Sequence, residues 1–311
     1  MPERGAHPLR TGPARYRETV TFNDNANVGG HTARRRGRTA AVAGGGVAGL
    51  GGLAVLVLAL LTGGSFDLGA LLGDGTTTGD GGGGSEIANC ETGADANASD
   101  DCRLAAASLN LDQYWAEQVD GYVQPQLIIV DGATSTRCGT ASNATGPFYC
   151  PPEQTVYVDP TFFGLLRQQF DATAGPLAQL YVLAHEYGHH VQNLIGVTEQ
   201  HPNDGTGATS NAVRTELQAD CFAGAWVADL PDQVDENGVP FMKAPTRAQV
   251  EDALNAAAAV GDDHIQQESG GFVNRDSWTH GSSEQRQRWF QVGYENGPTA
   301  CDTFSVSGAN L

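Results

Sequence analysis

The sequence predicts an α+β fold for residues 90–311, dominated by helices and with a small sheet, preceded by one transmembrane helix and a disordered linker. Three observations predict this division. The net charge changes sign along the chain, from +5 over the first 39 residues to −24 over the remainder. An uncharged apolar run follows the basic segment, and a glycine-rich stretch follows the apolar run.

The first 62 residues are predicted to form a basic cytoplasmic tail, residues 1–39, and a membrane anchor, residues 40–62. The run AAVAGGGVAGLGGLAVLVLALL is long enough to cross a bilayer core of about 30 Å. Four arginines precede it, so the positive-inside rule places the N-terminus in the cytoplasm and the main domain outside. They are Arg34, Arg35, Arg36 and Arg38. The prediction is a single-pass protein of the plasma membrane. The alternative is a cleaved signal peptide, for which the basic region is long.

The stretch at residues 63–89 contains GDGTTTGDGGGGSEIAN, a composition that predicts a flexible linker. Beyond it the chain is acidic, whereas a nucleic-acid surface requires clustered basic side chains. We therefore expect no nucleic-acid partner for the main domain. The sequence does not indicate an oligomeric state.

All six cysteines follow the apolar run, and an even count beyond a predicted membrane segment is typical of disulfide-bonded, exported domains. Six cysteines allow many pairings. The short spacings favour Cys90–Cys102 and Cys138–Cys150, which leaves Cys221–Cys301. No C-x-x-C pair occurs in the sequence, which disfavours a zinc site made of cysteines.

Hydrophobic periodicity and helix start and stop signals predict the elements of the main domain. Helices are expected at residues 103–119, 162–170, 176–195, 211–229, 246–260 and 283–293, and buried strands at residues 126–131 and 155–159. Pro176 suits the first turn of the third helix, and Gly196 suits its end. Because the helices outweigh the strands, the fold class is helix-dominated.

The stretch YVLAHEYGHHVQNLIG, residues 181–196, places three histidines and a glutamate in an apolar helix. His185 and His189 are four residues apart, so they share one helical face and can reach a single metal ion. Glu186 follows the first histidine and can take a proton from a water held by the ion. We therefore expect two zinc ligands and a general base in this H-E-x-x-H pattern. His190 lies about 100° around the helix from His189, which favours either a supporting contact to a ligand residue or a packing role.

A zinc peptidase needs a third protein ligand. A metzincin would have glycine at position 192 and histidine at position 195, but these are Gln192 and Ile195, so that class is excluded. The helix expected at residues 211–229 carries Glu216 and Asp220, again four residues apart, in the apolar stretch NAVRTELQADCFAGAW. We expect Glu216 to complete a site for one Zn²⁺ ion. Asp220 is expected to accept N–H from a ligand histidine.

Several segments together resemble a known family. They are HEYGHHVQ and ELQADCFAGAW, with TRCGTASNATGPFYCPPEQTVYVDPTFF upstream and DSWTHGSSEQRQRWFQVGY and CDTF downstream. These segments look like the putative neutral zinc metallopeptidases, a bacterial membrane-anchored group. The resemblance covers nearly the whole of residues 90–311. It implies a zincin-like metallopeptidase domain without naming a substrate.

More distantly, the arrangement is similar to the gluzincins, especially the prenyl-protein and heat-shock membrane zinc proteases. In these proteases a T-H-P segment follows the glutamate helix, with an arginine six residues after its histidine. Thr279-His280-Gly281 and Arg286 match this element, with glycine in place of proline. The resemblance implies that His280 donates to the oxyanion of the tetrahedral intermediate and that Arg286 helps to hold the site together. The alternative for His280 is a loop histidine with a local hydrogen bond. By the same likeness, the strand at residues 155–159 would be the edge with which an extended peptide pairs.

These features predict a membrane-anchored, extracytoplasmic zinc endopeptidase that hydrolyses a peptide or protein substrate. Two alternatives remain open. One is a zinc-binding scaffold of the envelope without proteolytic activity. The other is a zinc amidase that acts on cell-wall peptides. A structural zinc site has a protein ligand at its fourth position. The pattern here offers three ligands and a general base, which disfavours the scaffold.

Overall fold

The computed structural model describes residues 22–37, 84–169, 175–268 and 272–311. Its longer helices are α4 (Asp100–Gln118), α5 (Phe162–Gln169), α6 (Pro176–Leu194), α8 (Asn211–Asp229), α9 (Arg247–Ala259) and α11 (Ser283–Asn296). Shorter ones are α3 (Gly93–Ala98), α7 (Val197–Gln200) and α10 (Asp262–Glu268). All six predicted helices are confirmed to within one turn at either end.

The main sheet joins strands from distant parts of the chain. Its order is β2-β1-β3-β7-β6. The strands are β1 (Arg34–Arg36), β2 (Ser85–Glu86), β3 (Gln126–Val130), β6 (Phe148–Cys150) and β7 (Thr155–Val158). The three inner strands are parallel, and each outer strand is antiparallel to its neighbour. A separate hairpin pairs β4 (Ala133–Thr136) with β5 (Gly139–Ser142). The two predicted strands are confirmed as β3 and β7.

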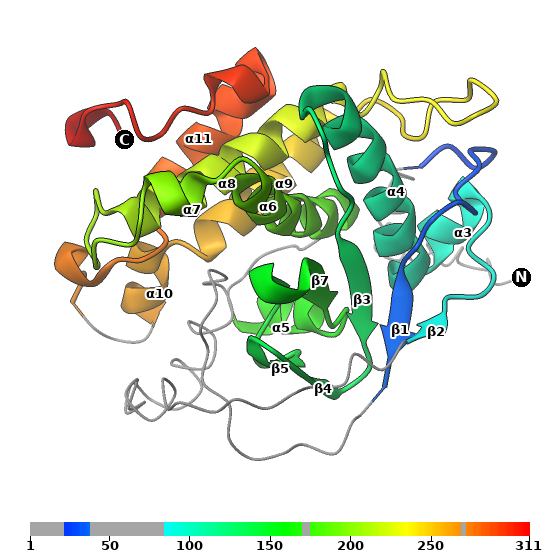
Figure 1. Ribbon diagram of the computed structural model, residues 1–311, viewed down its shortest axis with the longest axis horizontal. Helices are drawn as coiled ribbons and strands as arrows, with labels where there is room; N and C mark the ends of the chain where they lie inside the picture. Colours follow the sequence, from blue (N-terminus) through cyan, green and yellow to red (C-terminus); the bar gives the residue numbers. More distant parts are fainter. Residues whose placement is uncertain (1–21, 38–83, 170–174, 269–271) are drawn as a thin grey trace, which may run out of the picture.

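A layer of helices lies over this sheet, with α6, α8 and α9 above β3 and β7 in the view of Figure 1 and the β4–β5 hairpin at the bottom. The predicted helix-dominated α+β class is therefore confirmed. Side chains of Ser210, Thr246 and Ser282 cap the first turns of α8, α9 and α11 by accepting backbone N–H groups. These caps explain why the helix starts are readable from the sequence.

Close helix packing brings three helices together around the polar interior. α6 contacts α8, and α8 contacts α11. A Cβ at Gly188 of α6 would lie 2.9 Å from the Cα atom of Ala219 on α8. A Cβ at Gly293 of α11 would overlap the carbonyl oxygen of Cys221 on α8. Glycine therefore allows both contacts, since a side chain at either position would force the helices apart.

Three disulfides join described residues, and they have the pairing that the spacings favour. They are Cys90–Cys102, Cys138–Cys150 and Cys221–Cys301. The second joins the β4–β5 turn to β6, and the third joins α8 to the segment that follows α11. Disulfides are typical of proteins that fold in an oxidising compartment.

The N-terminal segment contradicts the predicted membrane topology. β1 lies between β2 and β3, and Phe22, Ala26 and Val28 before it are fully buried. A strand that pairs with β3 cannot lie on the opposite side of a bilayer from β3, because the membrane would have to separate hydrogen-bonded neighbours. The predicted cytoplasmic N-terminus and single-pass plasma-membrane location are therefore wrong.

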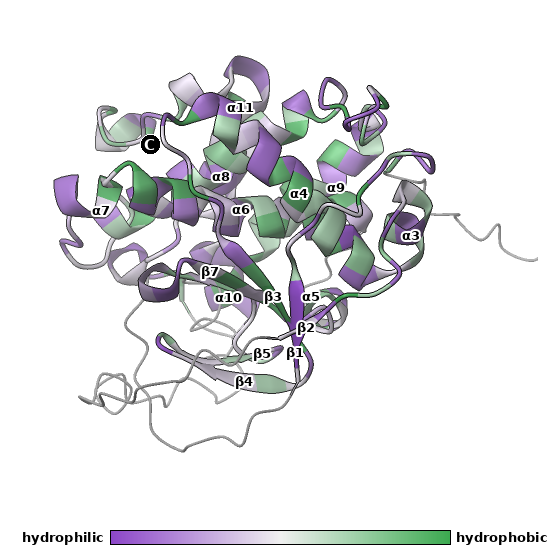
Figure 2. Cartoon of the chain, turned by 45° about the vertical axis from the view of Figure 1, so that its right-hand side comes forward, coloured by the Kyte–Doolittle hydropathy of each residue, from purple (hydrophilic) through white to green (hydrophobic). Residues whose placement is uncertain are grey.

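Of the four arginines predicted to flank an anchor, the three that the structure describes contact the folded domain instead. Arg35 forms an ion pair with Asp101, and the guanidinium of Arg36 lies over the ring of Tyr157. Figure 2 shows β1 as hydrophilic beside the more hydrophobic β3. In the part of the chain that the structure describes, no helix has the length and apolar character needed to cross a bilayer, so the transmembrane helix of the predicted fold is not supported. The predicted anchor at residues 40–62 lies outside the described residues, as does most of the predicted linker.

Candidate metal centre

The two histidines of the H-E-x-x-H pattern lie on one face of α6, as their spacing predicts. His185 and His189 are 1% and 3% exposed, and their ring centroids are 4.8 Å apart. The rest of the helix is mostly apolar and buried. Buried imidazoles need partners because their desolvation is unfavourable. The question is therefore what each ring nitrogen contacts.

Glu216 of α8 lies opposite both rings. Its Oε2 atom is 3.2 Å from His185 Nε2, and its Oε1 atom is 3.6 Å from His189 Nε2. One ligand atom from each of the three residues can be chosen so that all lie within 4.8 Å of one another. His189 Nε2 is buried and has no hydrogen-bond partner among the described residues. Two imidazoles and a carboxylate, with no hydrogen bond to His189 Nε2 in the described residues, form a donor set that suits Zn²⁺.

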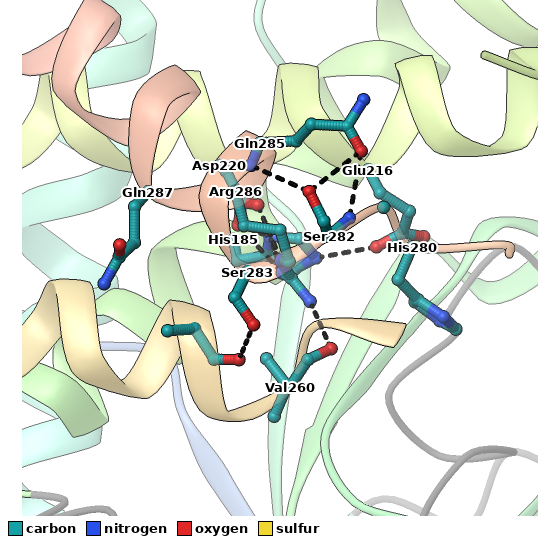
Figure 3. A network of polar contacts seen from close by, with 12 residues as sticks. His185, Glu216, Asp220, Val260, His280, Ser282, Ser283, Gln285, Arg286 and Gln287 are labelled. Atoms are coloured by element: carbon teal, nitrogen blue, oxygen red, sulfur yellow. Dashed lines mark hydrogen bonds and ion pairs between the residues drawn. The ribbon is translucent and has the colours of Figure 1, made fainter. Parts of the chain in front are cut away.

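Asp220, one turn beyond Glu216 on α8, holds the outer nitrogen of His185. Its Oδ1 atom is 2.8 Å from His185 Nδ1. The guanidinium of Arg286 on α11 donates to both oxygens of this carboxylate, at 2.8 and 2.9 Å, and to the carbonyl oxygen of Val260 (Figure 3). The hydroxyl of Tyr181 donates to Asp220 as well. The side chains expected to support the ligands, Asp220 and Arg286, are thus brought to the same place.

The charges of this network favour a cation between the ligands. Burial opposes the ionisation of Asp220, but Arg286 and His185 outweigh it and lower the pKa of Asp220 to about 2. Burial also works against a charge on His185, yet Asp220 raises the pKa of His185 to about 9. Burial likewise disfavours the charged form of Glu216, whereas His189 and His185 hold its pKa well below its usual value. The site is therefore arranged to stabilise positive charge between two carboxylates.

Glu186 is buried beside the two histidines, at 1% exposure. Burial raises its pKa, while the charges of both histidines and the backbone N–H of Tyr149 act in the opposite direction. Its Oε2 atom has no hydrogen-bond partner in the described part of the chain. A carboxylate with an unpaired oxygen and a raised pKa is suited to accept and release a proton.

His280 lies in the loop before α11 and is 3% exposed. Its Nδ1 atom is 2.8 Å from the hydroxyl of Thr279, a local contact, and 3.3 Å from Asp262 Oδ1. Its Nε2 atom is buried without a hydrogen-bond partner in the described ranges. Burial lowers the pKa of His280, but Asp262 and Glu216 outweigh it and raise the pKa above its ordinary value. Gly281 follows with φ +88° and donates its backbone N–H to Asp262. Proline can do neither, which explains the glycine where the gluzincin pattern has proline.

Three residues of this region were not predicted. Tyr181 contacts Asp220, and Asp262 contacts His280. Gln192 accepts a hydrogen bond from His189. Tyr181 lies four residues before His185 and Gln192 three after His189, spacings compatible with contact on a helix, but polar residues at such spacings are common. Only the side chains that they contact in the folded structure distinguish them from other polar residues.

The strand predicted to pair with an extended peptide, at residues 155–159, does not lie at the edge of the sheet. β7 is covered on both sides, by β3 and β6, so residues 155–158 have no free edge. The outer strand next to the site is β6, which Cys150 joins to Cys138. His190 packs as expected, with its ring nitrogens 3.0 Å from the Tyr149 hydroxyl and 2.6 Å from the carbonyl oxygen of Val123.

Comparisons with known proteins agree with this donor set. The family model described as "Putative neutral zinc metallopeptidase" matches residues 15–304. An uncharacterized protein of Mycobacterium tuberculosis strain H37Rv is 48% identical over 226 residues, 72% of this chain and 77% of that protein. The uncharacterized protein YpfJ of Escherichia coli K12 is 44% identical over 204 residues, 62% of this chain and 67% of that protein.

No solved structure matches the chain significantly. The family match nevertheless covers all of the described residues up to 304 and all three members of the donor set, His185, His189 and Glu216. This chain therefore belongs to the family of putative neutral zinc metallopeptidases.

Proposed function

We propose that the protein is a zinc-dependent peptidase that holds one Zn²⁺ ion with His185, His189 and Glu216 and uses Glu186 as general base. The observation that carries the proposal is the convergence of His185, His189 and Glu216 from two helices, with Glu186 beside them. Within the described residues, buried atoms of His189 and Glu186 have no hydrogen-bond partner. Structural zinc sites use four protein ligands, whereas hydrolytic sites use three and keep one position open. In the described residues, the grouped His/Cys/Asp/Glu donors number three.

Each residue around the zinc position then has a separate role in peptide hydrolysis. A bound zinc ion would supply Lewis acidity at the carbonyl and make water more acidic. Glu186 takes the proton from the attacking water and passes it to the leaving amine, so no proton is gained or lost. Asp220 and Arg286 keep the His185 ring oriented, with its Nε2 atom toward the ligand position.

His280 is proposed to stabilise the oxyanion of the tetrahedral intermediate. Its contacts with Asp262 and the charge of Glu216 favour the protonated ring, whose buried Nε2–H then has no partner within the described residues. A preorganised donor of this kind is most useful where negative charge develops in the transition state. An extended peptide that adds to the sheet would pair with β6, because β7 is already covered.

The proposal is tested on the full chain, since β1, residues 34–36, is part of the sheet. We expect wild type to bind one zinc ion and to hydrolyse casein or a quenched peptide. Glu186→Gln should keep the zinc and lose at least about 100-fold in kcat, the usual contribution of a general base. His189→Ala should lose the zinc. Glu199→Gln, a change of an exposed glutamate on α7, is the matched control and should alter neither quantity.

Two outcomes would contradict the proposal. Full activity in Glu186→Gln would remove the general base from the mechanism. If wild type and Glu186→Gln both bind zinc but neither hydrolyses protein substrates or cell-wall peptides, the scaffold alternative is favoured. Cleavage confined to cell-wall stem peptides would leave the chemistry intact and identify an amidase.

A further inference from the structure

The two ligand histidines of the proposed site are held in different ways. The outer nitrogen of His185 contacts a carboxylate, Asp220, whereas the outer nitrogen of His189 is 2.8 Å from the amide oxygen Oε1 of Gln192. Gln192 lies three residues after His189, outside the H-E-x-x-H pattern, and is 2% exposed. A buried amide beside a metal ligand can contribute both to metal binding and to packing.

The contacts of Gln192 determine which way its amide points. Its Nε2 atom donates to the carbonyl oxygen of Thr215 at 2.7 Å and to Gln218 Oε1 at 3.0 Å. A backbone carbonyl can only accept, so this end of the amide must be the NH₂ group. The other end, which faces His189, must then be the oxygen. His189 therefore donates from Nδ1, and its Nε2 atom keeps a free lone pair on the side of Glu216.

The orientation of Gln192 is itself supported by a second glutamine. Gln218 on α8 donates its Nε2 to the carbonyl oxygen of Cys301 at 2.9 Å, which leaves its Oε1 to accept from Gln192. Cys301 is bonded to Cys221, which lies three residues after Gln218 on α8. The disulfide thus keeps the accepting carbonyl against the helix that carries Gln218. All members of this relay are buried, so water does not compete for their hydrogen bonds.

We propose that Gln192 is the positioning residue of His189: it selects the Nδ1–H tautomer and orients the ring, and Gln218 and the Cys301 carbonyl support it. The inference rests on the proposed function, because it assigns a role toward the zinc ion of that site. Gln192 touches neither substrate nor reacting atoms, so its effect is on metal binding. Loss of such a partner weakens metal affinity by about 10- to 100-fold.

The test compares two substitutions that a packing role would rank in the opposite order. Gln192→Met keeps the shape and removes the acceptor. Gln192→Glu keeps an acceptor for His189 Nδ1 but places a carboxylate against the carbonyl oxygen of Thr215. Zinc affinity is measured by competition with a chromogenic chelator, and stability by urea unfolding with excess chelator.

We expect Gln192→Met to weaken zinc binding about 10- to 100-fold with little loss of stability, and Gln192→Glu to bind zinc close to wild type with a larger loss of stability. Gln218→Met should weaken binding less, because it acts through Gln192. Gln287→Met is the control: this glutamine on α11 also donates to a backbone carbonyl, that of Leu254, and should bind zinc as wild type does. The visible spectrum of the Co²⁺-loaded protein should change in Gln192→Met and stay unchanged in Gln287→Met.

Wild-type zinc affinity in Gln192→Met would overturn this inference and leave the proposed function standing. Failure of wild type to bind zinc would overturn both. If Gln192→Met does not fold, the comparison of Gln218→Met with Gln287→Met decides. Equal affinities in that pair would count against the relay, and a weaker Gln218→Met would support it.

Discussion

The helical layer and the sheet of this protein are assembled from the chain in different ways. The helices that carry the proposed ligands, α6 and α8, follow one another with only the short α7 between them. In the sheet, β1 from residues 34–36 lies beside β3 from residues 126–130. The helices contain their own backbone hydrogen bonds, whereas β1 obtains its partners only when distant segments meet. The sheet therefore depends on long-range contacts, and the site depends on how closely the helices pack.

The largest expected effect comes from removing the long-range part of the sheet. Deletion of residues 1–37 removes β1 and the buried side chains of Phe22 and Val28, each worth about 1.5–3 kcal/mol. Together with the lost pairing of β3, this approaches the whole stability of a domain, about 5–15 kcal/mol. We expect the truncated chain to lose its cooperative unfolding transition, measured by circular dichroism on heating.

Deletion of residues 1–14 is the control, because these residues precede the family match. It should leave the transition unchanged. A truncated 38–311 chain that unfolds at the wild-type temperature would show that the sheet is stable without its N-terminal strand.

The next largest effect comes from the buried charges that join α8 to α11. Arg286→Met leaves Asp220 buried without its main cation, and breaking a buried pair in this way destabilises a protein by about 3–5 kcal/mol. The measurement is urea unfolding with excess chelator. Arg247→Met breaks an exposed pair with Glu251 and should change the free energy of unfolding by less than about 1 kcal/mol.

One result would count against this account of the helical layer, and a double variant tests it further. Equal effects of Arg286→Met and Arg247→Met would mean that Asp220 does not need Arg286. A double variant, Arg286→Met with Asp220→Leu, should recover much of the lost stability, because it removes both buried charges.

The smallest effect expected here comes from helix packing. Gly293→Ala places a Cβ against the carbonyl oxygen of Cys221 and should destabilise the protein by about 1–3 kcal/mol through overpacking. Gly164→Ala on α5 meets only the tip of Arg167, at 3.9 Å, and should be neutral or stabilising by up to about 1 kcal/mol. Thermal unfolding of both variants separates the two cases. A stabilising Gly293→Ala would show that α8 and α11 can move apart freely.

The parts of the fold that were predicted correctly have local causes. Caps such as Ser210 and Ser282, and the proline at position 176, mark helix ends within a few residues of sequence. The strands β3 and β7 are apolar enough to be recognised alone. β1 consists of three arginines, a pattern that indicates no strand, and its basic character beside an apolar run was interpreted as a membrane flank. Pairing with β3 is what makes it a strand, and nothing near residues 34–36 in the sequence records that pairing.

For the site, the sequence by itself determined the pairs His185 with His189 and Glu216 with Asp220, because residues four apart on a helix share a face whatever surrounds the helix. Tertiary structure alone decided that the two pairs meet, that Arg286 neutralises Asp220, and that contacts from α8 turn the amide oxygen of Gln192 toward His189. It also decided that β6 and not β7 is the outer strand. The physical reason is that a hydrogen bond or ion pair acts over about 3 Å in space, so its partners are set by how elements pack and not by their spacing along the chain.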